Sequence, residues 1–148
     1  MPVMILIHMN SFVFAADDLG ITNWKILGPF LGAPRDGGID HLLSYGGEKQ
    51  IIPSDNQVFY SALADKGIVT WSKLTDQTEN IEIKYENVDW NSVIHRFGST
   101  GLINIGYAIT EVTVPEQRRV LVMTRKVPVF FVNGQGYLGD PCSSGFHY

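Results

Sequence analysis

The sequence predicts an all-β protein, an antiparallel β-sandwich. Apolar residues make up 45% of the chain and charged residues only 18%, which is typical of a globular domain with a substantial core. Segments with the alternation of β-strands follow one another, turn signals separate them, and no segment carries a long apolar stripe at the helical period. The 148 residues are one domain's worth of chain.

The N-terminal stretch MPVMILIHMNSFVFAADD predicts a signal peptide over residues 1–16, ahead of a single domain over residues 17–148. Val13 and Ala15 supply the small side chains that signal peptidase requires just before its cleavage point. No Lys or Arg precedes the apolar part, and His8 and Asn10 interrupt it, so a misplaced start codon or a first strand is the alternative. We therefore expect a secreted, periplasmic or cell-surface protein of bacterial type. No stretch reaches the ~18 apolar residues of a membrane-spanning helix.

The first predicted strand of the domain is NWKILGPF. We expect Gly28-Pro29 to end it, because glycine permits a bend and proline has no N–H to donate to a neighbouring strand. GIVTWSKL, IEIKYENV and TGLINIGYAITEVTVP are the next strand segments. In the last of these, one face carries Ile103, Ile105, Tyr107 and Ile109.

Towards the C-terminus, RVLVMT and VPVFFVNG complete the series of predicted strands. Asn133-Gly134 is the strongest turn signal of the chain, because both residue types tolerate positive φ. Only two short segments favour helix, residues 40–45 and VDWNSVIHRF. We expect Trp24, Trp71 and Phe131 to lie in the core, each burying on the order of 150–250 Å².

Five motifs, in this order, resemble a module found at the front of many large secreted bacterial hydrolases. They are WKILGPF, then GGID with GGE and a proline after it, then VTWSKL, a Y-A-x-T-x-V strand and V-N-G. The match spans residues 21–140, although Leu31 stands where the module has a second proline. The resemblance implies a galactose-binding-like, jelly-roll sandwich. The positions that carry it are Trp24, Gly28, Pro29, Asp40, Glu48, Trp71, Tyr107, Asn133 and Gly134.

The resemblance also implies a role. Such modules are non-catalytic and pack against a downstream catalytic domain of the same polypeptide, either a serine hydrolase resembling prolyl oligopeptidases and esterases or a glycoside hydrolase. The chain stops at GDPCSSGFHY without the family's next strand, so we expect a fragment whose last strand is missing. In this interpretation, the glycine-rich connection before Glu48 wraps one end of the sandwich, and the carboxylates of Asp40 and Glu48 accept hydrogen bonds from its amides.

The chain's own residues predict little chemistry. A net charge of −4 without a basic patch argues against nucleic-acid binding. The single cysteine, Cys142, excludes an internal disulfide. FGSTG lacks the spacing of a nucleophile elbow, and His95 is more typical of a packed or surface side chain than of a general base. We therefore expect no enzymatic activity from this chain.

Carbohydrate binding is the alternative function, because sugars are held by exposed aromatic rings with polar neighbours. The candidate ligand-binding residues are Trp90, Asn91, Arg96 and Tyr137. We expect no cofactor. The alternative is a calcium ion, which takes hard oxygen ligands from loop carboxylates. Its candidate ligands are Asp36, Asp40 and Glu48.

Overall fold

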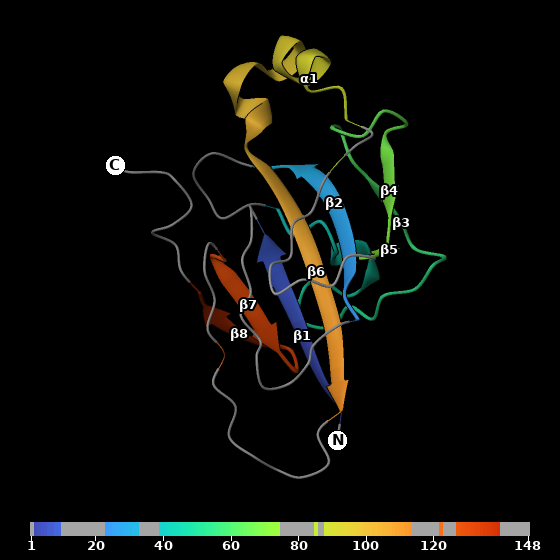
Figure 1. Ribbon diagram of the computed structural model, residues 1–148, viewed down its shortest axis with the longest axis vertical. Helices are drawn as coiled ribbons and strands as arrows, with labels where there is room; N and C mark the ends of the chain where they lie inside the picture. The colour runs from blue at the N-terminus through green and yellow to red at the C-terminus, as the bar shows by residue number, and fades with distance from the viewer. Residues whose placement is uncertain are drawn as a thin grey trace.

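The fold consists of a six-stranded antiparallel sheet with a two-stranded sheet beside it (Figure 1). The computed structural model describes residues 23–32, 39–74, 85, 88–113, 122 and 127–139, together with the backbone of residues 2–9. Every ladder in these residues is antiparallel. The all-β prediction is therefore confirmed at the level of fold class.

The strands and helices of the described residues have the following bounds, in chain order. The part of the chain that the structure describes contains eight strands: β1 (Pro2–Met9), β2 (Lys25–Leu31), β3 (Val58–Tyr60), β4 (Ile68–Thr70), β5 (Ser72–Lys73), β6 (Asn104–Thr113), β7 (Val129–Val132) and β8 (Gln135–Leu138). The helices are α1 (Trp90–Phe97) and the two short 3-10 segments Leu43–Tyr45 and Gly98–Leu102.

The large sheet has the order β5-β2-β6-β1-β7-β8, and β3 pairs with β4 in the small sheet. The N-terminal strand β1 therefore lies inside the large sheet, between β6 and β7 (Figure 1). This is the first strand that the sequence left open as an alternative to a signal peptide. The signal peptide itself stays a prediction.

Strand β2 continues through Gly28-Pro29, so the expectation that this pair ends the strand was wrong. Leu27 lies opposite Tyr107 of β6 and Phe30 lies opposite Ile105, so three steps on β2 correspond to two on β6. This is a β-bulge. Gly28 takes a φ of 142° and the Gly28–Pro29 peptide bond is cis. The bulge removes the need for a ladder hydrogen bond from proline, and pairing resumes at Phe30.

The core lies between one face of the large sheet and a second layer formed by residues 39–57 and the hairpin β3–β4. The prediction that Trp24, Trp71 and Phe131 are core residues is confirmed, since they are 5%, 6% and 7% exposed. Of the predicted face, Ile105, Tyr107 and Ile109 are core residues of β6, whereas Ile103 precedes the strand and is only partly buried. The central cluster comprises Leu27, Phe30, Leu42, Ile51, Phe59, Trp71, Ile105, Tyr107, Ile109 and Phe131.

The turn between β7 and β8 confirms the prediction at Asn133-Gly134, with φ of 50° and 79°. Strands joined by two such residues keep the right-handed twist of the sheet. A Cβ at Gly134 would lie 2.7 Å from the carbonyl oxygen of Lys49, so glycine is needed there for space as well as for φ. The turn is thus pressed against the loop that precedes β3.

Of the two predicted helical segments, VDWNSVIHRF forms α1. The Asp89 carboxylate accepts hydrogen bonds from the N–H groups of Asn91 and Ser92, both at 3.1 Å, and so caps the helix. Residues 40–45 form only the 3-10 turn Leu43–Tyr45. The predicted strand IEIKYENV lies largely outside the described residues, as does RVLVMT.

Candidate functional site

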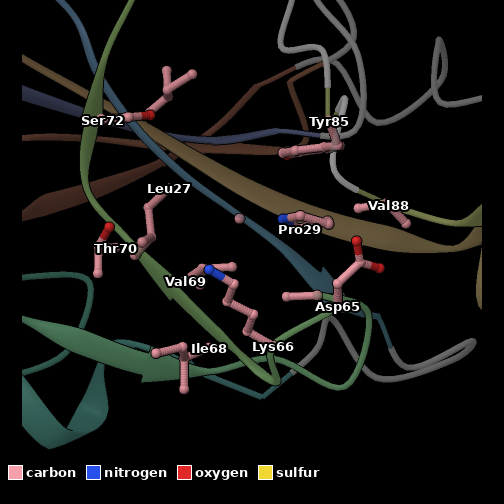
Figure 2. Close-up of a pocket in the computed structure, with 13 residues that line it drawn as sticks. Leu27, Pro29, Asp65, Lys66, Ile68, Val69, Thr70, Ser72, Tyr85 and Val88 are labelled. Carbon is pink, nitrogen blue, oxygen red and sulfur yellow. The ribbon is translucent and has the colours of Figure 1, made fainter.

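A cavity of about 480 Å³ opens between β2 and the segment that leads into β4 and β5 (Figure 2). Its walls come from three parts of the chain: the bulge of β2, residues 64–72, and Tyr85 with Val88. The apolar lining consists of Ile26, Leu27, Pro29, Ala64, Ile68, Val69 and Val88. The polar lining consists of Asp65, Lys66, Thr70, Ser72 and Tyr85.

Tyr85 lies over the bulge of β2, and two glycines make room for its hydroxyl. A Cβ at Gly106 would lie 2.2 Å from Tyr85 Oη, and one at Gly28 would lie 3.0 Å from it. Burial raises the pKa of the Tyr85 hydroxyl, so the group stays protonated. Tyr85 lines the cavity, and a tyrosine hydroxyl can both donate and accept a hydrogen bond.

The charged residues of the cavity are at its outer side. Asp65 and Lys66 are exposed, and Figure 2 shows the Lys66 side chain extending towards Val69 while the Asp65 carboxylate points towards Pro29. Among the described residues, neither forms an ion pair. The site therefore offers hydroxyls and one charge of each sign around an apolar floor. It can hold a small ligand that has both hydrogen-bonding groups and an apolar face.

A second polar cluster lies in the loop that contains the GGID and GGE motifs. The Asp40 carboxylate accepts hydrogen bonds from the N–H groups of Leu42, at 2.9 Å, and Glu48, at 3.1 Å. A Cβ at Gly47 would lie 2.6 Å from Asp40 Oδ2, and Gly47 has a φ of 78°, so glycine is required on both counts. The expectation that Asp40 holds loop amides is confirmed.

The Glu48 carboxylate accepts a hydrogen bond from the Tyr107 hydroxyl, which is a partner that the sequence did not predict. Burial, together with the nearby Asp40 charge, raises the pKa of Glu48. Burial and the Glu48 charge also raise the pKa of Tyr107, so that its hydroxyl remains a donor. Tyr107 is fully buried, and its oxygen also accepts a long hydrogen bond from the His41 N–H at 3.4 Å.

His41 completes this cluster by stacking on Phe30, with ring centroids 4.3 Å apart. Its Nε2 atom is buried and has no hydrogen-bond partner among the described residues. Burial lowers the pKa of His41, against smaller opposing effects of the Leu31 backbone and the Asp40 charge. The imidazole is therefore held in its neutral form, and the cluster ties the loop to the core.

The candidate ligand-binding residues from the sequence lie in two separate places. Trp90, Asn91 and Arg96 belong to α1, where Arg96 is over the Phe97 ring at 5.0 Å. Tyr137 is on β8 and stacks on Phe130, with ring centroids 5.3 Å apart. Helix α1 lies at the top of the view in Figure 1, and β8 lies well below it at the edge of the large sheet, so the two groups do not form one site.

The cavity residues were missed by the sequence analysis. The signal that points to them is the pair of glycines, Gly28 and Gly106, inside strands that are otherwise apolar: a glycine inside a strand marks a close approach by another group. The identity of the approaching group can be seen only in the tertiary structure, because Tyr85 is distant from both glycines in sequence.

Of the candidate calcium ligands, Asp36 lies outside the described residues. The single cysteine, Cys142, lies outside them too. In the part of the chain that is described, no three His, Cys, Asp or Glu side chains gather as a metal site would require. No helix in those ranges has the length and apolar character to cross a membrane. Comparison of the chain with protein-family models, curated proteins and solved structures returned no match.

Proposed function

We propose that this chain is a non-catalytic accessory module, a jelly-roll sandwich of a secreted multidomain hydrolase, that docks against the downstream catalytic domain through the outer face of β3 and β4. The observation that carries the proposal is the apolar character of this face. Val58, Tyr60 and Ile68 point outwards and are 47%, 76% and 50% exposed. Tyr60 lies directly opposite Ile68 in the ladder, so the exposed side chains are neighbours.

Scattered exposed apolar residues are ordinary, but neighbours on one face are typical of an interaction surface. In a hairpin that ends in water, the outer face carries polar side chains. The free edge of β3, unlike its outer face, is already covered by a side chain of the same protein. The Tyr45 hydroxyl accepts a hydrogen bond from the Val58 N–H at 3.2 Å and donates one to its carbonyl at 3.4 Å. A partner therefore packs on the face and does not add a strand at that edge.

The test compares hydrogen exchange in this chain alone and in the longer polypeptide. We expect the amides of β3 and β4 to exchange more slowly in the longer polypeptide, because docking covers them. Tyr60→Lys should remove that protection, whereas the control Leu138→Lys, at a position 85% exposed on β8, should leave it intact. Equal exchange of β3 and β4 in both contexts would contradict the docking role.

Carbohydrate binding is the second candidate function, and the cavity beside β2 is the observation that favours it. Thr70, Ser72 and Tyr85 supply hydroxyl groups, and Leu27 and Val69 supply an apolar surface. A sugar ring presents hydroxyls at its rim and C–H groups on its faces, so it fits such a lining. Titration with xylan, pectin and galactan oligosaccharides tests this function. Binding should weaken in Tyr85→Phe and be unchanged in Tyr137→Phe; no binding of any of them would exclude these sugars.

A further inference from the structure

The imidazole of His41 carries a buried nitrogen, Nε2, that has no hydrogen-bond partner among the described residues. The ring is stacked on Phe30, with the centroids 4.3 Å apart and the planes 13° apart. The imidazole also hydrogen-bonds to the Leu31 backbone, and because Nε2 is unpartnered, Nδ1–H is the donor to that carbonyl. Nε2 is therefore the lone-pair nitrogen of the neutral ring, and it is the atom that would take up a proton.

The described groups that face this ring come from three elements. Strand β2 supplies an aromatic ring and a backbone carbonyl, and neither is charged. The loop supplies the Asp40 carboxylate, whose charge favours a protonated imidazole. Strand β6 supplies the Tyr107 hydroxyl, which accepts a hydrogen bond from the His41 backbone N–H and donates its own proton to Glu48. None of these groups accepts a hydrogen bond from Nε2.

A proton on Nε2 would create a buried N–H donor without an acceptor, on a ring that has become a cation. Both changes are costly away from water. Attraction of the cation to the Phe30 ring and to the Asp40 charge offsets part of this cost. Burial outweighs these attractions, because the pKa of His41 is lowered. The folded loop therefore favours the neutral ring, and a charged ring is better accommodated in water.

The segment around His41, residues 40–48, also covers the edge of β3. Its Tyr45 hydroxyl is hydrogen-bonded to the N–H of Val58 at 3.2 Å and to the Val58 carbonyl at 3.4 Å. Leu42 is the buried apolar side chain of this segment, and residues 43–46 are exposed. A segment with so few buried apolar contacts can open without unfolding of the sheet.

We propose that residues 40–48 form a pH-sensitive latch: on acidification His41 takes a proton at Nε2, leaves the Phe30 ring and releases the segment, with Tyr45, from β2, β6 and the edge of β3. A rise in pH restores the neutral ring and closes the latch. The release frees the N–H and carbonyl of Val58 for another partner. The latch stands on the contacts of the loop and does not depend on docking through the outer face of β3 and β4.

His41 and Glu48 act in opposite directions as the pH changes. The pKa of His41 is lowered in the closed loop, so the open loop binds a proton more readily and opening becomes easier as pH falls below 6.5. The pKa of Glu48 is raised in the closed loop, so its protonation favours the closed loop as pH falls. Glu48→Gln removes this second effect and keeps an oxygen that can accept from Tyr107.

The experiment therefore uses the full chain with Glu48→Gln, alone and combined with His41→Phe or His41→Asn. Phenylalanine keeps a ring against Phe30, asparagine keeps a donor for the Leu31 carbonyl, and neither titrates. Amide hydrogen exchange is measured by NMR from about one pH unit above to about one unit below 6.5. Each rate is converted to a protection factor, which removes the intrinsic pH dependence of exchange.

The reporters are the N–H groups of Gly47, bonded to the Leu42 carbonyl, and of Val58. With Glu48→Gln alone, their protection should fall by about three- to tenfold as pH falls across this range. Tenfold is the limit for one ordinary histidine over about two pH units. Amides of the β2–β6 ladder should keep their protection, and the fall should disappear in both His41 variants.

Three results would overturn the latch. The first is a fall of less than about threefold with Glu48→Gln alone. The second is an equal fall in the His41 variants, because another group would then drive the opening. The third is a parallel fall in the β2–β6 ladder, because that result indicates unfolding of the whole sheet. If one His41 variant does not fold, the other supplies the comparison.

Discussion

Substitution of Gly106 by alanine tests the position of Tyr85 directly. The new Cβ would lie 2.2 Å from Tyr85 Oη, a separation that must grow to at least 3.0 Å. Overpacking of this kind costs about 1–3 kcal/mol. Replacing a glycine inside a strand with alanine returns about 0.5–1 kcal/mol. We therefore expect Gly106→Ala to lower the free energy of unfolding by about 1–2 kcal/mol.

The same substitution should be harmless once the tyrosine hydroxyl is gone. In Tyr85→Phe, the nearest atoms to the Cβ at position 106 are the ring carbon Cζ and the Leu27 carbonyl oxygen, both at 3.6 Å, which is ordinary contact. Gly106→Ala in that background should leave stability unchanged or raise it slightly. The two substitutions should thus show a favourable coupling of about 1–3 kcal/mol in a double-mutant cycle.

Urea denaturation of the four proteins measures this coupling, with the slope of each transition checked for two-state behaviour. Gly28→Ala is the control. A Cβ there would lie 3.1 Å from Gly106 Cα, and the φ of 142° excludes a side chain regardless of space, so Tyr85→Phe should not rescue it. Equal costs of Gly106→Ala in the presence and absence of the Tyr85 hydroxyl would refute the close approach, and with it the wall of the cavity.

Three further predictions concern the loop cluster and the core. Burial and the Asp40 charge raise the pKa of Glu48 above its ordinary 4.5. Above pH 4.5 the folded chain therefore holds a proton that the unfolded chain has lost, so the free energy of unfolding should fall as pH rises from 4.5 through the folded pKa. Glu48→Gln should flatten this fall. Urea midpoints measured across that pH range test the prediction. Ser61→Ala should cost about 1–3 kcal/mol in urea denaturation, because the hydroxyl donates to the Pro29 carbonyl and accepts from the Leu63 N–H in a buried site; a neutral substitution would contradict those bonds. Trp24→Ala should cost about 3–5 kcal/mol, and an unchanged thermal midpoint would mean that Trp24 is not a core residue.

The predictions that the structure confirms are those with a local cause. The alternation of Ile105, Tyr107 and Ile109 follows from the period of a strand, so one face of β6 was predictable without knowledge of its partners. Asn133 and Gly134 mark a turn because of their own backbone preferences.

The prediction that Gly28-Pro29 ends a strand was wrong because the local preference on which it rested fits two different structures. Proline cannot donate to a ladder, and this local fact is compatible both with the end of a strand and with a bulge inside one. The choice between them depends on β6, where Ile105 lies beyond the bulge and takes Phe30 as its partner. Because Phe30 and Ile105 are far apart in the sequence, their pairing could not be predicted from it.

The sequence by itself determined an all-β chain, the apolar faces of its strands, the short helix α1 and the loop acid Asp40, since periodicity and turn chemistry act over a few residues. Only the tertiary structure decided which distant groups meet. It paired Glu48 with Tyr107, placed Tyr85 over Gly106, and inserted β1 between β6 and β7. Such contacts join segments whose order along the chain says nothing about their distance in space, so they are selected by the packing of the whole core.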